Sequence, residues 1–538
     1  MQDADKTHGR VATSRPRSPK LIVRKNFATF VTKKHMGLYS FQTYKSFHQE
    51  GFKPRRDLPA WQLANPVKWD ANPFSDRNWQ FQLNGWRCLD PILNEYFKTG
   101  GTRYLEEAIL LAVNWWRYAR KNSKAKFVWQ DMATGLRAFR LALFLDRIFT
   151  KQIELPDDVV NALLQCAEQH IGKLQNERFI REGNHGVFQI FGLNLLAKVA
   201  LGPGAYAACK EYCQRMFAYI IEAGYTNEGV HKEHSPTYHL FTTGRIKSFQ
   251  SEALADPRVL ELLDQADRVM PWLVEPNGRI VPIGDSADEA SPLDGKVPLT
   301  TLQSGRQFAV ADLTKSGYAI IRSDPSVRDQ PSMLAMTGMW YSEMHKHNDE
   351  LSFTLFEHGE PVFIDSGKYG YQYDDKRAYI VSAAGHNTVS FRDPAIEVGR
   401  PNRKGSFLNP ITQEDDGFVI GGEVDREAFT HSRRLLYSPE QHLHIIDTVQ
   451  GSPGAEYATS LHFSHELEPV LLPDGFEVRL RCGKLIRGTV EGADLLLARG
   501  ETGPMLGWES VDYLKLAPAS TVRAVFSDRK VAWRIDLN

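Results

Sequence analysis

The chain has 538 residues and a formal net charge of zero, because 65 Lys and Arg balance 65 Asp and Glu. The 42% hydrophobic and 11% aromatic content excludes a disordered protein. The balanced charge gives no support for a nucleic-acid partner, and no apolar run is long enough to predict a membrane span.

The first twenty residues are polar and lack the apolar segment of a signal peptide. We expect residues 1–20 to form a disordered tail. With no signal peptide in this chain, bacterial periplasm and cytoplasm stay open as alternative compartments.

The five cysteines are too few and too irregular for a disulfide scaffold. Cys209 and Cys213 lie four residues apart in a segment with helical periodicity. A metal pair is one interpretation of this spacing, and we expect buried free thiols instead.

From residue 102 onward, apolar residues recur with the period of an α-helix. The predicted helices span 102–120, 136–148, 159–174, 187–199, 206–221 and 259–273. Short polar connections make them successive antiparallel helices, each of which buries its apolar face on its neighbours. A solenoid and a helical toroid both satisfy this pattern, and no fixed sequence repeat is present.

After a polar, proline-containing stretch at 285–305, the apolar pattern shortens to strand length. Predicted strands lie within 317–324, 351–365, 442–451, 485–500 and 521–537. Many short strands broken by turn residues are typical of an antiparallel β-sandwich. We therefore expect an α+β multidomain protein, with a helical domain at 21–305 and a β domain at 306–538.

Polar residues of catalytic type gather in two parts of the helical half. Asn184 and His185 stand at the entry of a predicted helix. The segment 228–239 holds His231, Glu233, His234, Tyr238 and His239, with Pro236 at an early helix position. Capping and buried core histidines are the alternative explanation for any one of them, but their density favours a functional site.

A second group of polar residues lies in the β half. His345 and His347 occupy alternate positions of a segment predicted to be extended, so both imidazoles are expected on one face. Asp365 ends an apolar strand and His386 precedes another. Two histidines and a carboxylate from neighbouring strands are suitable zinc ligands, although polar residues at strand ends also serve turns.

Taken in order, these motifs resemble the heparinase II/III-like polysaccharide lyases. The resemblance rests on N-W-Q-F-Q-L-N at 78–84, N-H-G at 184–186, E-G-x-H-x-E-x-S-P-x-Y-H at 228–239, H-x-H-N-D-x-L-S-F at 345–353, G-x-P-V-F-x-D-S-G-x-Y-x-Y at 359–371 and G-H-N-T-V at 385–389. It spans about residues 75–450. The resemblance implies an N-terminal (α/α) toroid of antiparallel helices followed by a C-terminal antiparallel β-sandwich.

The same resemblance implies the residue roles. Tyr238 and His345 match the catalytic tyrosine and histidine, and Asn184 and His185 match the pair that neutralises the substrate uronate carboxylate. The residues that match a zinc site of structural type are His347, Asp365 and His386. The residues assigned to substrate binding are Arg137, His234 and His239.

The expected reaction is β-elimination on a uronic-acid polysaccharide, either a glycosaminoglycan such as heparan sulfate or alginate. In this reaction a base removes the C5 proton and an acid protonates the 4-O leaving group.

Two alternative functions stay open. A glycoside hydrolase would need paired carboxylates, for which Glu228 with Glu233 or Asp349 with Glu350 are available. A non-catalytic polysaccharide-binding protein would need neither Tyr238 nor His345. The sequence leaves monomer and homodimer as alternatives.

Overall fold

A computed structural model of the chain describes residues 30–248, 254–287, 299–302, 304–324, 331–338, 341, 343–399, 405–527 and 529–538. The tail predicted at 1–20 lies outside these residues. The chain divides into two compact units, unit 1 with Met1–Ile221 and Ile246–Asp256, and unit 2 with Glu222–Arg245 and Pro257–Asn538. Each unit is described by itself.

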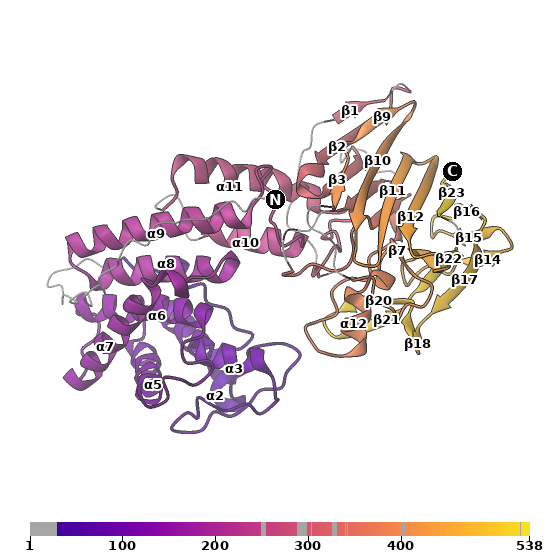
Figure 1. The fold of residues 1–538 in the computed structure, drawn as a ribbon. Coiled ribbons are helices and arrows are strands. Elements are labelled where there is room, and N and C mark those ends of the chain that lie inside the picture. The colour runs from indigo at the N-terminus through magenta and orange to yellow at the C-terminus, as the bar shows by residue number, and fades with distance from the viewer. Residues whose placement is uncertain are drawn as a thin grey trace, which may run out of the picture. The chain divides into compact units, whose positions relative to one another are not determined.

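Unit 1 is built from helices, coloured indigo to magenta in Figure 1. Their bounds are α1 Lys33–Met36, α2 Tyr44–Glu50, α3 Arg77–Asn84, α4 Asp90–Thr99, α5 Thr102–Lys121, α6 Asp131–Phe149, α7 Asp157–Leu174, α8 Gly183–Ala200 and α9 Pro203–Gly224. The last residues of α9 belong to unit 2. Within the described residues, no helix combines the length and apolarity that crossing a bilayer requires.

The predicted helical periodicity is confirmed in α5. All residues of its predicted apolar stripe are buried except Leu111, which is half-buried. Proline begins α9, as it also begins α10 and α11 in unit 2, because the first helical residue has no partner for an N–H group. Cys209 and Cys213 are buried free thiols on α9, as predicted.

Helices α6 and α8 lie side by side (Figure 1) and touch through glycines. A Cβ atom on Gly135 would lie 2.6 Å from the carbonyl oxygen of Phe188, and one on Gly192 would lie 2.5 Å from that of Gly135. Both distances are shorter than any side chain tolerates, so glycine permits this close backbone approach. The contact brings the first turns of the two helices together.

In the part of the chain that the structure describes, unit 2 contains three α-helices and all of the strands. The helices are α10 Pro236–Ser248, whose last residues belong to unit 1, α11 Pro257–Val269 and α12 Asp375–Val381. The strands are β1 Leu299–Thr301, β2 Gln307–Leu313, β3 Tyr318–Ser323, β4 Met333–Thr337, β5 Phe353–Glu357, β6 Glu360–Phe363, β7 Val389–Phe391, β8 Phe407–Leu408, β9 Thr412–Glu414, β10 Gly417–Asp425, β11 Phe429–Ser438, β12 His442–Gly451, β13 Tyr457–His462, β14 Val470–Leu472, β15 Gly475–Arg479, β16 Leu485–Glu491, β17 Asp494–Arg499, β18 Glu501–Thr502, β19 Met505–Leu506, β20 Trp508–Asp512, β21 Lys515–Pro518, β22 Ser520–Phe526 and β23 Lys530–Asp536.

All pairings between these strands are antiparallel, as the short alternating segments predict. One sheet has the order β1-β2-β3-β4-β5-β6. A second has the order β14-β15-β16-β23-β12-β11-β10-β8, with β9 paired to β10, and a third has the order β17-β22-β13-β7. Strands β10, β11 and β12 of the second sheet are the long orange arrows in Figure 1. One hydrophobic core joins residues of all three sheets.

The six-stranded sheet is buried on both faces, and every residue of β3 is buried. One face contributes Ile321, Leu334 and Phe353 to the shared sandwich core. The other face packs on a separate cluster that includes Val269 at the end of α11 and Trp272 in the 3₁₀ turn that follows it. The end of α11 and the turn after it therefore pack with the strands.

Glu357 on β5 is fully buried and accepts a hydrogen bond of 2.6 Å from the Tyr437 hydroxyl on β11. Burial raises the pKa of Glu357 from 4.5 to about 7. Because its pKa is higher in the folded state, its contribution to stability is present at low pH and is lost as the pH rises through about 7.

We expect Glu357→Gln to unfold like the wild type near pH 4, below the unfolded-state pKa of 4.5, and to be more stable by up to roughly 3 kcal/mol near pH 9. The amide stays neutral at both values and can still accept from Tyr437. Chemical unfolding of both proteins at the two pH values measures this difference. A difference in unfolding free energy that does not grow with pH would show that folding does not raise the pKa of Glu357.

Candidate active site

The candidate active site in unit 2 forms where two chain segments meet at Gly284. Gly284 has φ of +57°, and a Cβ atom there would lie 2.7 Å from the carbonyl oxygen of His345 and 2.8 Å from that of His234. The N–H group of Asp285 donates to the same His345 carbonyl at 2.9 Å. Glycine is required at this position, and it brings the segment before α10 close to the segment that carries His345.

Tyr238, in the first turn of α10, stacks on His345. The ring centroids are 3.5 Å apart and the ring planes differ by 14°. His345 has φ of +61°, in the left-handed region that side chains seldom occupy. The extended conformation predicted for 345–347 is therefore wrong, because the backbone turns at His345. Such strained residues are found most often at functional sites.

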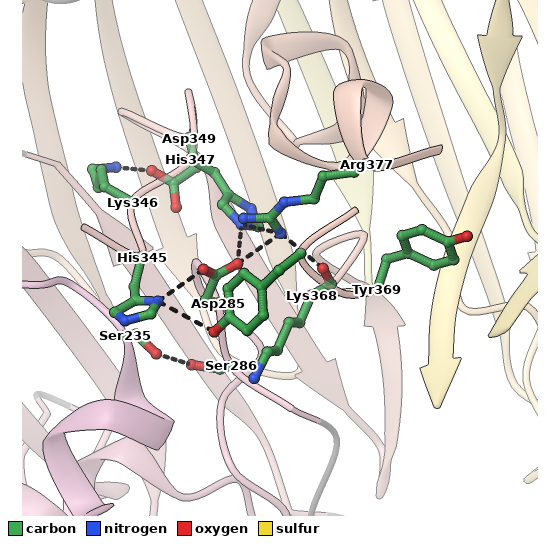
Figure 2. A network of polar contacts seen from close by, with 12 residues as sticks. Ser235, Asp285, Ser286, His345, Lys346, His347, Asp349, Lys368, Tyr369 and Arg377 are labelled. Carbon is green, nitrogen blue, oxygen red and sulfur yellow. Dashed lines mark hydrogen bonds and ion pairs between the residues drawn. The ribbon is translucent and has the colours of Figure 1, made fainter. Parts of the chain in front are cut away.

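Asp285 joins three side chains from two other segments, as Figure 2 shows. Its carboxylate lies 2.9 Å from His345 Nδ1, 3.0 Å from His347 Nε2 and 2.7 Å from Arg377 Nη1. Only 1% of Asp285 is exposed. Burial alone would raise the pKa of Asp285, but the two histidine hydrogen bonds and the charge of Arg377 hold it far below its usual range.

A second tyrosine lies beside the stacked pair. The hydroxyl groups of Tyr371 and Tyr238 are 2.7 Å apart, and the Tyr371 hydroxyl lies 3.3 Å from His345 Nδ1. Burial raises the pKa of Tyr238 to about 12, and the charges of Asp285 and Glu233 add to this effect. Tyr238 is therefore a neutral phenol near pH 7 and has a proton to donate.

Two cationic side chains lie over the tyrosine rings. Lys368 Nζ is 5.0 Å from the centre of the Tyr371 ring and 5.6 Å from that of Tyr238. The Arg377 guanidinium is 5.6 Å from the Tyr371 ring. These distances are typical of cation–π contacts, and they place positive charge beside the two phenol rings.

The predicted metal ligands come together in a buried cluster. Nitrogen atoms of His347 and His386 and a carboxylate oxygen of Asp365 all lie within 4.8 Å of one another. His347 Nδ1 and His386 Nε2 are buried and have no hydrogen-bond partner. Buried unpaired nitrogens are costly unless something binds them, so this set of two imidazoles and one carboxylate fits zinc.

Asn387 holds the loop that carries His386 against the strands. Its amide donates to the carbonyl oxygens of Phe353 and Ile364 at 2.8 Å each, and its side-chain oxygen accepts from the N–H of His462 at 2.6 Å. These three bonds fix the residue that directly follows His386. The position of His386, a candidate metal ligand, is thus determined by the sandwich.

Asn184 and His185 lie in unit 1, in the first turn of α8, as predicted. His185 Nδ1 is 2.9 Å from Asp131, which starts α6, and Arg181 Nε donates to the other oxygen of Asp131 at 3.0 Å. The Asp131 carboxylate accepts the hydrogen bond from Nδ1 of His185. The other ring nitrogen, Nε2, is therefore available to a ligand. The close contact of α6 with α8 makes this pair possible.

The three residues assigned to substrate binding are buried. Arg137 donates to His170 at 3.0 Å and to the carbonyl oxygens of Asn84 and Val128 at 2.7 Å each. Burial lowers the pKa of Arg137 to about 9. Arg137 has no exposed surface in unit 1, so we interpret it as a residue that orders the core instead of contacting substrate directly.

His234 and His239 are at most 2% exposed. The ring of His234 stacks on that of Tyr341 with centroids 5.4 Å apart. His239 accepts from the N–H of His231 at 3.2 Å and donates to the Ala266 carbonyl at 2.9 Å. Both rings therefore support the loop that precedes α10 and Tyr238.

The carboxylates that a hydrolase would need are already engaged. Asp349 and Glu350 are completely buried and pair with Lys346, as Figure 2 shows for Asp349. Glu350 also accepts from Arg426 at 2.7 Å. Glu228 accepts from the Ser316 hydroxyl at 2.5 Å. This does not favour the paired-carboxylate mechanism of glycoside hydrolysis.

Sequence reasoning missed Asp285, Asp131, Tyr371, Lys368 and Arg377. Asp285 follows the apolar run I-V-P-I-G, and this position at the end of an apolar segment was the available signal. Tyr371 closes the motif at 359–371 and was present in the resemblance without a role. Nothing in the sequence around Arg377 indicates that its side chain reaches Asp285.

Comparisons with known proteins find matches for both parts of the chain. Residues 28–259 match the family model described as heparinase II/III N-terminus, and residues 305–527 match heparinase II/III-like, C-terminal. An alginate lyase of Stenotrophomonas maltophilia (strain K279a) is 25% identical over 242 residues, which are 41% of this chain and 30% of that protein. The chain thus spans less than a third of this curated relative.

Two solved structures share the fold over nearly the whole chain. A heparinase III structure has a TM-score of 0.70 at 14% identity and covers 98% of this chain and 87% of its own. A mutant heparan sulfate lyase from Pedobacter heparinus has a TM-score of 0.65 at 16% identity, with coverages of 96% and 84%. These similarities confirm the predicted fold class, a helical toroid followed by a β-sandwich.

Proposed function

Because the chain belongs to the heparinase II/III-like family, we propose that it is a polysaccharide lyase that cleaves a uronic-acid-containing polysaccharide by β-elimination. The observation that carries this proposal is the stack of Tyr238 on His345. Asp285 orients the His345 imidazole by accepting a hydrogen bond from Nδ1. A phenol and an imidazole in contact supply an acid and a base to one sugar ring.

The uronate carboxylate must be neutralised before the C5 proton can leave, because the elimination moves negative charge onto it. We assign this task to Asn184 and a protonated His185, whose side chains can donate hydrogen bonds to the carboxylate oxygens. Asp131 orients His185 for this task by accepting from Nδ1, which leaves the second N–H of the imidazolium for the substrate. The amide and the imidazolium then stabilise the charge that develops in the transition state.

Proton transfer is divided between His345 and Tyr238. His345 Nε2 takes the C5 proton, the released electron pair forms the C4–C5 double bond, and the bond from C4 to the leaving oxygen breaks. Tyr238 donates its proton to that oxygen. Glu233 lies 3.7 Å from His345 Nε2 and stabilises the imidazolium that forms. If the C5 proton and the leaving group share one face of the sugar, Tyr238 would have to lose its own proton, against its raised pKa, before it could serve as both base and acid.

His347, Asp365 and His386 would hold a zinc ion that ties the loops of the sandwich together. We expect complete metal removal to lower the melting temperature, and to lower kcat by no more than about tenfold with KM nearly unchanged, because the ion does not touch substrate. Metal analysis, chelation and assay of the folded apoprotein test this. A folded apoprotein without any turnover would instead indicate a Lewis-acid role.

The proposed substrates are a glycosaminoglycan such as heparan sulfate and, second, alginate. The shared fold with heparinase III and a heparan sulfate lyase supports the first, and the local identity to an alginate lyase supports the second. Incubation with a panel of uronic-acid polymers tests the proposal, since each elimination creates an ultraviolet-absorbing unsaturated end. Absence of such a product on every polymer would contradict it.

A further inference from the structure

Asp285 accepts hydrogen bonds from both the candidate base and a candidate metal ligand. An ionised carboxylate can only accept hydrogen bonds, so its contacts of 2.9 Å and 3.0 Å assign the shared protons to His345 Nδ1 and His347 Nε2. Arg377 Nη1, which is itself only a donor, lies farther from His347 Nε2, at 3.4 Å. One side chain therefore sets two imidazole tautomers. Figure 2 shows the two rings and the Arg377 guanidinium converging on this carboxylate.

The two tautomers have separate consequences. In His345, protonation of Nδ1 leaves the lone pair on Nε2, the atom that faces Glu233 and that is proposed to take the C5 proton. In His347, protonation of Nε2 leaves the lone pair on Nδ1, which is buried and has no hydrogen-bond partner. Nδ1 is then the atom available for a metal ion.

We propose that Asp285 is a positioning residue that couples the His347/Asp365/His386 cluster to the catalytic His345. The proposal rests on the proposed lyase function for its effect on turnover, and on geometry alone for its effect on the metal. A carboxylate behind a metal-binding histidine orients that ring and strengthens its binding. Here the same carboxylate also orients the base.

The positive charge of Arg377 balances the buried negative charge of Asp285. Its charge pairs with Asp285 at 2.7 Å, and its second bond, 2.8 Å to the Lys368 carbonyl, anchors it to the loop after β6. The carboxylate is thus paired with a permanent positive charge, and neither imidazole is needed to balance it.

The test compares Asp285→Asn and Asp285→Glu with the wild type. The Asn side chain offers one acceptor oxygen and one donor nitrogen, so it cannot accept from both imidazoles. The Glu side chain keeps the charge and serves as a second variant that preserves the fold. Glu360→Gln is the matched control, because Glu360 is buried on β6 and pairs with Arg481 at 3.1 Å.

Two quantities are measured in each protein: zinc affinity by competition with a chelator, and kcat and KM with zinc saturating. For Asp285→Asn we expect zinc affinity to fall ~10–100-fold and kcat to fall ~10–100-fold, with KM changed less than about threefold. Asp285→Glu should lie between Asp285→Asn and the wild type in both quantities. Glu360→Gln should match the wild type in both.

Unchanged zinc affinity and kcat in Asp285→Asn would overturn the proposal, and so would a loss of kcat with unchanged zinc affinity, because the coupling would then be absent. If the wild type makes no unsaturated product from any polymer, the lyase function fails. The zinc competition still decides whether Asp285 supports the metal cluster, so the two failures are distinguishable.

Discussion

Replacing Tyr238 with Phe is expected to lower kcat for elimination by about 1,000-fold, within the range that general acid–base groups contribute. The substitution removes only the hydroxyl group that would protonate the leaving oxygen. The phenyl ring can still stack on His345, so KM should change little. The rate of unsaturated product formation under substrate saturation measures the effect.

Tyr457→Phe is the matched control, since Tyr457 lies in the sandwich core and is 4% exposed. It should keep wild-type kcat. If Tyr238→Phe also kept near wild-type kcat, Tyr238 would not be the acid. Tyr371 would then replace it, because its hydroxyl lies 2.7 Å away.

Replacing His345 with Gln is expected to lower kcat by about 100- to 1,000-fold. Glutamine can still offer a hydrogen bond to Asp285, but it has no basic nitrogen to take the C5 proton. We expect this loss for substrates whose C5 proton lies on the face of the sugar opposite the leaving group. Single-turnover kinetics of the wild type and the variant, with oligosaccharides of each C5 configuration, measure the loss.

His442→Gln is the control for this series, because His442 is an exposed histidine on β12. The double variant Tyr238→Phe/His345→Gln should lose no more than about tenfold beyond the slower single variant, since residues that act as a unit are non-additive. Fully multiplicative losses would show that the stacked pair acts as two independent groups.

The elements of the fold could be predicted because their period is local. The stripe in 102–120 and the alternating strands at 442–451 are determined by neighbouring residues, and the structure places α5 and β12 there. Local periodicity does not distinguish a helical toroid from a solenoid. The toroid was predicted from the resemblance to the heparinase II/III-like family.

The candidate site could be predicted only in part, because its contacts join residues far apart in sequence. His345 and Asp285 are 60 positions apart, and they meet because Gly284 lets the backbone approach. The polar stretch that begins at Asp285 has the composition of a linker, so its first residue attracted no role. Burial of Arg137 depends on the aromatic core around it, including Trp115, whose ring lies 4.1 Å from its guanidinium carbon.

The most direct test of the proposed lyase function is the mass and structure of the product from one defined uronic-acid oligosaccharide. Elimination splits the substrate into two fragments whose masses add up to that of the substrate, and it leaves a C4–C5 double bond at the new non-reducing end. We predict this result for the wild type. Fragments that together contain one added water and no double bond would contradict the account and indicate hydrolysis.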